Sequence, residues 1–195
     1  QWLPLSFQEI MTKEWNLIIL IGYPTAESSQ NDLIRLRQKI SDYNLPLIFF
    51  LDGDVDSKQL ERLLGWNPID ELLADKSVNQ ISVKPTRAGL EHPLIKNFQK
   101  VSVSEIIWRE LPPIGSPFRR IRLKPSLLTI IESTDIAENP VIAINQESNK
   151  PLALCIGLDF WRWSFMTNEI RRFDIYDELF QGMTKYLTDT LSTSP

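Results

Sequence analysis

Two short apolar runs near the start of the chain predict neighbouring strands of a buried sheet. Residues 16–22 and 46–51 are almost wholly apolar and too short for core helices, which is typical of strands covered on both faces. Between them we expect a helix capped by Ser28 or Ser29. Its apolar stripe consists of Leu33, Leu36, Ile40 and Tyr43. A strand, a helix and a second strand predict a βαβ unit with parallel strands.

The middle of the chain has a weaker pattern. Asp52, Gly53 and Asp54 predict a tight turn after the second apolar run, and Asp56 is placed to cap a short helix. We expect residues 65–80 to be irregular or helical and residues 81–84 to form a short strand. Prolines interrupt residues 85–117, where a brief helix is predicted over residues 104–110.

The last third of the chain returns to clear periodicity. Residues 118–123 alternate between apolar and basic, as in a half-exposed strand. Three apolar strands are expected over residues 127–131, 141–145 and 152–156, and the short polar links between them predict antiparallel hairpins. Asp174 is placed to cap a final helix. The apolar stripe of that helix is Ile175, Leu179, Met183 and Leu187.

These elements together predict an α/β fold: a three-layer sandwich around a mostly parallel sheet with an antiparallel extension. With 195 residues, the chain fits one domain spanning residues 1–195. Ligands of such sheets bind beyond the carboxyl ends of the strands. Three turns occupy those positions: residues 22–25, 52–54 and 157–159.

Charge and composition narrow the possible functions. A formal net charge of −4 argues against a dedicated nucleic-acid binder, which usually presents a basic face. The sequence has no apolar run long enough to cross a bilayer, and a single cysteine excludes an internal disulfide. Because the chain begins at Gln1 without a signal peptide, we expect a domain excised from a longer protein.

Several segments carry a family resemblance. They are residues 16–24, residues 46–51, Glu91-His92-Pro93-Leu94, residues 108–113 (WRELPP) and residues 157–163 (GLDFWRW). In this order they resemble the class I glutamine amidotransferase-like domains of large bacterial membrane-anchored proteins. The His-Pro-Leu piece is similar to one in trehalose-utilisation (ThuA-like) proteins. The resemblance covers roughly residues 15–190 and lacks the first strand of the full fold. It implies a flavodoxin-like core and an extracytoplasmic place in a bacterial inner-membrane protein.

The catalytic pattern of that family is missing. Active members place a cysteine on a tight turn between strand and helix and pair it with a histidine and a glutamate. The corresponding turn here follows residue 51, where Asp52 and Asp54 stand. Cys155 lies inside an apolar run with no histidine after it, so we expect it to be a buried core residue.

The remaining polar candidates can be explained by structural roles as well as by catalysis or metal binding. His92 is the sole histidine, which excludes a two-histidine metal site. As a general base, His92 would need a nucleophile as its partner. Asp52, Asp54 and Asp56 alternate as in a calcium loop but lack its glycine and its later glutamate. Turn formation and capping explain them, so no metal is predicted. With neither a Walker loop nor a dinucleotide fingerprint, no cofactor is predicted.

An aromatic cluster offers a candidate surface for a sugar or a protein partner, and it consists of Trp161, Arg162, Trp163 and Phe165. Trp161 and Trp163 would share one face if the segment were a strand, with Arg162 stacked against them, or they would cap the core. The basic residues of positions 119–124 are expected to be solvated and locally paired.

Two hypotheses follow. The first is a non-catalytic interaction module that binds a protein partner or other domains of its parent protein. Its predicted surface comprises Tyr23, Asp52, Asp54, His92, Trp161, Arg162 and Trp163. The alternative is a hydrolase or ThuA-like carbohydrate-related enzyme using His92 with Asp52, Asp54 or Glu91. A pocket joining His92 to the aspartates would favour the enzyme, and a filled strand-end crevice with an exposed aromatic patch would favour the module.

Overall fold

A central mixed sheet organises the protein. The computed structural model describes residues 6–96, 105–135, 138–147, 149–165 and 175–192. Within these residues the main sheet has six strands, in the order β1-β2-β8-β7-β6-β4. Their bounds are β1 Ile18–Ile21, β2 Leu47–Leu51, β8 Leu152–Ile156, β7 Pro140–Asn145, β6 Leu127–Ser133 and β4 Val83–Pro85.

The sheet is parallel on one side and antiparallel on the other. β1, β2 and β8 run parallel, with Ile18 opposite Leu47 and Phe50 opposite Cys155. From β8 onward each strand is antiparallel to its neighbour, through β7 and β6 to β4. The predicted βαβ unit and the predicted hairpins are therefore confirmed, as is the α/β class with an antiparallel extension.

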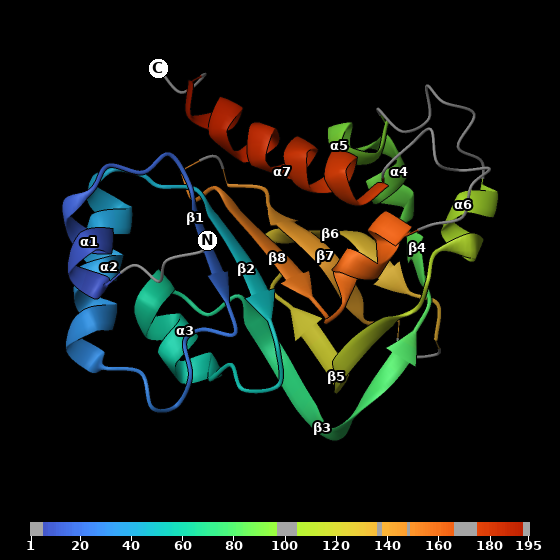
Figure 1. Ribbon diagram of the computed structural model, residues 1–195, viewed down its shortest axis with the longest axis horizontal. Coiled ribbons are helices and arrows are strands. Elements are labelled where there is room, and N and C mark those ends of the chain that lie inside the picture. The colour runs from blue at the N-terminus through green and yellow to red at the C-terminus, as the bar shows by residue number, and fades with distance from the viewer. Residues whose placement is uncertain (1–5, 97–104, 136–137, 148, 166–174, 193–195) are drawn as a thin grey trace.

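One face of the sheet is covered by α2 (Gln30–Asp42) and α3 (Ser57–Leu64), with the short α1 (Phe7–Thr12) beside α2 (Figure 1). The Ser29 and Asp56 side chains cap α2 and α3. The core on this face consists of Leu33, Leu36, Leu60 and Leu63 packed with Phe49 and Leu154. Tyr43 does not continue the predicted stripe: it is the C-cap of α2 and is 66% exposed.

The opposite face is covered by α7 (Ile175–Ser192), which lies near the small helices α4 (Arg87–Glu91) and α5 (Pro93–Lys96) in Figure 1. Another short helix, α6 (Glu105–Glu110), corresponds to the one predicted over residues 104–110. The predicted stripe of α7 is confirmed, because Ile175, Leu179, Met183 and Leu187 are all buried in the core that includes Ile142. The predicted cap, Asp174, lies outside the described residues. No described helix has the length and apolarity to span a membrane.

A two-stranded arm, formed by β3 (Ile69–Ile81) and β5 (Ile114–Leu123), lies at the edge where β2 and β8 end (Figure 1). The prediction of an irregular or helical segment over residues 65–80 is wrong from Ile69 onward, where the chain forms β3. The pairing shifts register on both sides of Ala74, and these irregularities break the alternation by which a strand is recognised. The predicted strand at residues 81–84 begins later, at Val83, because Ile81 still belongs to β3.

Two arginines of the arm and the lysine that follows it form ion pairs. Glu71 lies 3.6 Å from Arg120 and 3.5 Å from Arg122, and Lys124 pairs with Asp70. These ion pairs are the local pairing expected for Arg120, Arg122 and Lys124.

Candidate functional site at the carboxyl edge of the sheet

The turns after β1 and β2 are joined at one edge of the sheet. Residues 22–25 follow β1 and residues 52–54 follow β2. Because the two strands are parallel neighbours, the two turns lie side by side at the carboxyl edge of the sheet. Gly22 has φ +59°, and a Cβ built there would lie 2.4 Å from Oδ2 of Asp52. The Asp56 N–H donates to the Pro24 carbonyl at 2.9 Å. The glycine thus provides both the left-handed backbone and the space that the Asp52 carboxylate fills.

Asp52 and Asp54 stabilise the turn in which they lie. Oδ1 of Asp52 accepts a hydrogen bond from the Asp54 N–H at 3.0 Å, and Asp56 caps α3 through the Gln59 N–H at 2.8 Å. Asp52 is half-buried, whereas Asp54 is exposed. The strand, turn and helix that would carry a nucleophile are present, and Asp52 stands at the turn. These contacts are the turn-forming and capping roles expected from the sequence.

The arm covers the ends of β2 and β8. Gly115 of β5 and Leu158 exchange two backbone hydrogen bonds, of 3.1 and 2.8 Å. Pro117, also on β5, lies 3.5 Å from the position of a Cβ on Gly53. Protein backbone therefore occupies part of the place where α/β enzymes usually bind their ligands.

The aromatic segment after β8 is a 3-10 helix, η2 (Phe160–Phe165), and the expectation of two tryptophans on one strand face is wrong. A 3-10 helix repeats every three residues, so side chains two positions apart point in different directions. Trp163 is 1% exposed, and its Nε1 donates to the Pro112 carbonyl at 3.0 Å. Trp161 is 55% exposed, and its Nε1 donates to the Asp159 carboxylate at 3.2 Å. One tryptophan is core and the other is surface.

Arg162 fastens η2 to the arm instead of stacking between the two indoles. Its Nη1 donates to the Gln80 side-chain oxygen at 2.9 Å and to the Pro113 carbonyl at 3.1 Å. Both acceptors lie at the end of β3 or just before β5. The charge is thereby used to hold the aromatic helix in place over the strand ends.

Trp161 and Phe165 form an exposed aromatic patch. Their rings meet edge to face, with centroids 5.8 Å apart and an interplanar angle of 87°. Phe165 is 75% exposed. The sequence pattern drew attention to this segment, but only the helical geometry separates Trp161 and Phe165 from Trp163. We refer to these two side chains as the aromatic patch.

His92 lies in a different region of the fold from Asp52 and Asp54. It is the C-cap of α4, which packs against β6 and β4, while Asp52 follows β2. β8 and β7 stand between β2 and β6, so three strand spacings of about 4.8 Å separate the two regions within the sheet. Nδ1 of His92 accepts a hydrogen bond from the Leu94 N–H at 3.3 Å. The imidazole packs against the ring of Tyr186 in α7, with ring centroids 4.8 Å apart. Burial lowers the pKa of His92. Glu91, beside it, is exposed.

Cys155 is in the core, as expected. It lies in β8 and is fully buried, and this burial raises the pKa of its thiol far above the ordinary value. A thiol in this state is a poor nucleophile because the reactive form is the thiolate. Among the residues that the structure describes, no group of three or more His, Cys, Asp or Glu side chains is placed to hold a metal ion.

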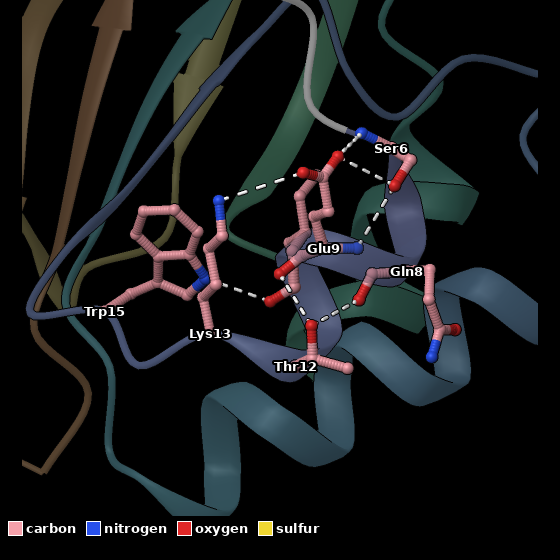
Figure 2. A network of polar contacts seen from close by, with 7 residues as sticks. Ser6, Gln8, Glu9, Thr12, Lys13 and Trp15 are labelled. Atoms are coloured by element: carbon pink, nitrogen blue, oxygen red, sulfur yellow. Dashed lines mark hydrogen bonds and ion pairs between the residues drawn. The ribbon is translucent and has the colours of Figure 1, made fainter.

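A cavity of about 440 Å³ lies between α1, β1 and α2, and sequence reasoning missed it. Tyr23 is the one predicted surface residue that lines it. The local signal was present: Ser6 and Glu9 form a capping box that starts α1, and the Trp15 indole then donates to the Ile10 carbonyl at 2.9 Å (Figure 2). These contacts hold α1 and Trp15 as a wall of the cavity.

The fold and this edge define the class: an α/β domain with a mixed sheet and helices on both faces. No family model and no curated protein matches the chain. Among solved structures it is similar to PurLQS from Thermotoga maritima, with 9% sequence identity and a TM-score of 0.43. The match covers 77% of this chain and 66% of that one, slightly less than two thirds of its length. A likeness this distant carries no argument about the function of the chain.

Proposed function

We propose that this chain is a non-catalytic interaction domain, which binds a protein partner or other domains of its parent protein through the aromatic patch. The proposal includes the amidotransferase-like origin suggested by residues 157–163 and by the His-Pro-Leu segment, and an extracytoplasmic place within a larger bacterial envelope protein. In this account the family's fold serves as a scaffold and its catalytic centre has been replaced by structural residues.

The exposure of the aromatic patch carries the proposal. Tryptophan and phenylalanine each bury a large area when covered, and tryptophan is enriched at the centres of protein interfaces. Trp161 is also held in place before any partner arrives, by the bond from its indole to Asp159 and by the Ser164 hydroxyl, which donates to its carbonyl at 2.7 Å. A side chain ordered in advance loses less conformational freedom on binding.

Three further features support a scaffold over an enzyme. The Asp52 carboxylate, at the position of the expected nucleophile, accepts a hydrogen bond from its own turn. The Cys155 thiol is buried in β8. His92 contacts α5 and α7 in place of the strand-end acids. Asp52, Cys155 and His92 therefore each have a structural role in the fold.

Hydroxyl-radical footprinting in the native setting tests this proposal. In the purified chain, Trp161 and Phe165 should be oxidised rapidly. In cells or membranes that contain the full-length protein and its partners, their oxidation should slow at least tenfold. Tyr43, exposed at the end of α2, is the matched control and should react equally in both settings. Equal oxidation of the patch in both settings would refute the proposed interface.

A further inference from the structure

β1 is an open edge of the main sheet. The Ile18 and Gly22 N–H groups donate toward β2, to the carbonyls of Pro46 at 3.0 Å and Phe50 at 2.9 Å. Because the backbone of a strand alternates direction at every residue, the N–H and C=O groups of Ile19 and Ile21 point away from β2. β1 stands at the end of the strand order, so no described strand pairs with these groups.

The open edge is also apolar. Ile19 is 51% exposed and Ile21 is 75% exposed. Natural edge strands are usually protected from pairing by charged residues, proline or a bulge, and the four residues of β1 (IILI) include none of these. An unprotected apolar edge is a template for another extended chain.

The cavity of about 440 Å³ adjoins this edge. Its volume is within the range of about 300–1,000 Å³ found for ligand pockets. The β1 segment provides Ile18, Ile19 and Leu20, and α1 and its following loop provide Phe7, Ile10 and Trp15. The cavity and the edge together form a groove with an apolar wall on one side and unpaired backbone on the other.

One end of the groove is acidic. Asp32 lines the cavity near Tyr23, and none of the described residues that line the cavity is a lysine or an arginine. The proximity of the two side chains is reflected in the pKa of Tyr23, which is raised mainly by burial and further by the Asp32 carboxylate, against a lowering effect of Ser28. A single carboxylate in an apolar lining favours an occupant with a positive charge at that end.

We propose that this groove binds an extended peptide segment, which pairs with Ile19 and Ile21 as an additional strand, inserts apolar side chains into the cavity and places a lysine or arginine near Asp32. Outward N–H and C=O groups two residues apart match the ladder of an extended backbone, which is the basis of peptide recognition by strand addition. This inference is independent of the aromatic patch.

Selection of peptides from a random phage-displayed library tests the proposal, with Ile19→Pro as the counter-selection variant. Proline at residue 19 removes the outward N–H and keeps the pairing of Ile18 and Leu20 with β2, so the edge strand should tolerate it. Ile19→Ala removes the same side chain and keeps the N–H, which makes it the matched control. Selected peptides should alternate apolar residues and include a basic one. They should bind Ile19→Pro at least tenfold more weakly than wild type, with a loss below threefold for Ile19→Ala.

Hydrogen exchange on the unmodified chain provides a second measurement that needs no variant. The Ile19 and Ile21 amides should exchange at least tenfold more slowly when a selected peptide is bound. Asp32→Asn should weaken the basic peptides at least fivefold, while Asp42→Asn, at the other end of α2, should leave their affinity unchanged. Failure to select any peptide, binding without protection of these amides, or a dimer that Ile19→Pro dissociates would each overturn the proposal. The last result would assign the edge to a second copy of the chain.

Discussion

Trp161 and Trp163 leave the same 3-10 helix in different directions: the indole of Trp161 is 55% exposed and packs on Phe165, and that of Trp163 is buried and donates to Pro112. This divergence places one aromatic residue in the core and leaves the other for contacts outside the chain. Core and surface roles in this segment are therefore separable by mutation.

The first prediction uses that separation. Trp163→Ala should lower the free energy of unfolding by about 3–5 kcal/mol, because it leaves a large cavity in the core. Trp161→Ala should change it by less than about 1 kcal/mol, because the side chain is mostly exposed. Urea denaturation of both variants measures the difference, and equal losses would contradict the assignment of the two indoles.

Gly89 allows a second prediction. A Cβ at this position in α4 would lie 2.0 Å from the backbone oxygen of Ile130 in β6, so Gly89→Ala forces the helix away from the sheet. We expect a loss of about 1–3 kcal/mol, which the better helix propensity of alanine offsets only in part. Gly53→Ala is the control, because its nearest contact is an ordinary 3.5 Å, and it should cost less than about 0.5 kcal/mol. Thermal unfolding that shows no difference between the two would contradict the close packing of α4 on β6.

A third prediction concerns pH. Burial lowers the pKa of folded His92, while the unfolded chain keeps the ordinary value of about 6.5. The unfolded state therefore binds more protons, and the contribution of neutral His92 to stability is fully present above pH of about 6.5 and decreases as the pH falls below it. The free energy of unfolding of wild type and of His92→Gln should be compared above and below pH of about 6.5. The difference between the two proteins removes the contribution of the carboxylates, which both share. If the free-energy difference between the two proteins stayed constant with pH, His92 would not titrate as described.

A fourth prediction concerns the single thiol. Because burial raises the pKa of Cys155, native protein should not react measurably with a thiol-specific disulfide reagent. Reaction should appear in urea and follow the unfolded fraction, as monitored in parallel by circular dichroism. Cys155→Ala provides the blank. Complete labelling in native buffer would place the thiol at an accessible site.

Elements dominated by local periodicity were predictable. The apolar runs of β1, β2 and β8 are continuous and too short for core helices, which indicates buried strands. The stripe of α7 repeats at the spacing of a helix. The Ser29 and Asp56 caps were also predictable, because each involves contacts within a few residues. The capping box of Ser6 and Glu9 was an equally local signal that went unused.

Features that depend on distant contacts were not predictable. β3 is a strand because β5 pairs with it, and its register shifts hide the alternation. The covering of the strand ends depends on the pairing of Gly115 with Leu158, which no local pattern encodes. The orientation of Trp161 required knowing that the segment repeats every three residues instead of two. The aromatic segment was recognisable in the sequence, whereas the cavity beside β1 and the grouping of residues at the strand ends were not.

Photo-crosslinking in living cells tests whether the aromatic patch contacts a partner. A benzophenone amino acid would replace Trp161 in one variant and Ile34, exposed on α2, in another. We expect a discrete adduct from position 161 that is absent from position 34 and that Phe165→Ala reduces at least tenfold. Identical adducts from both positions, or none from position 161, would contradict an interaction surface at the aromatic patch.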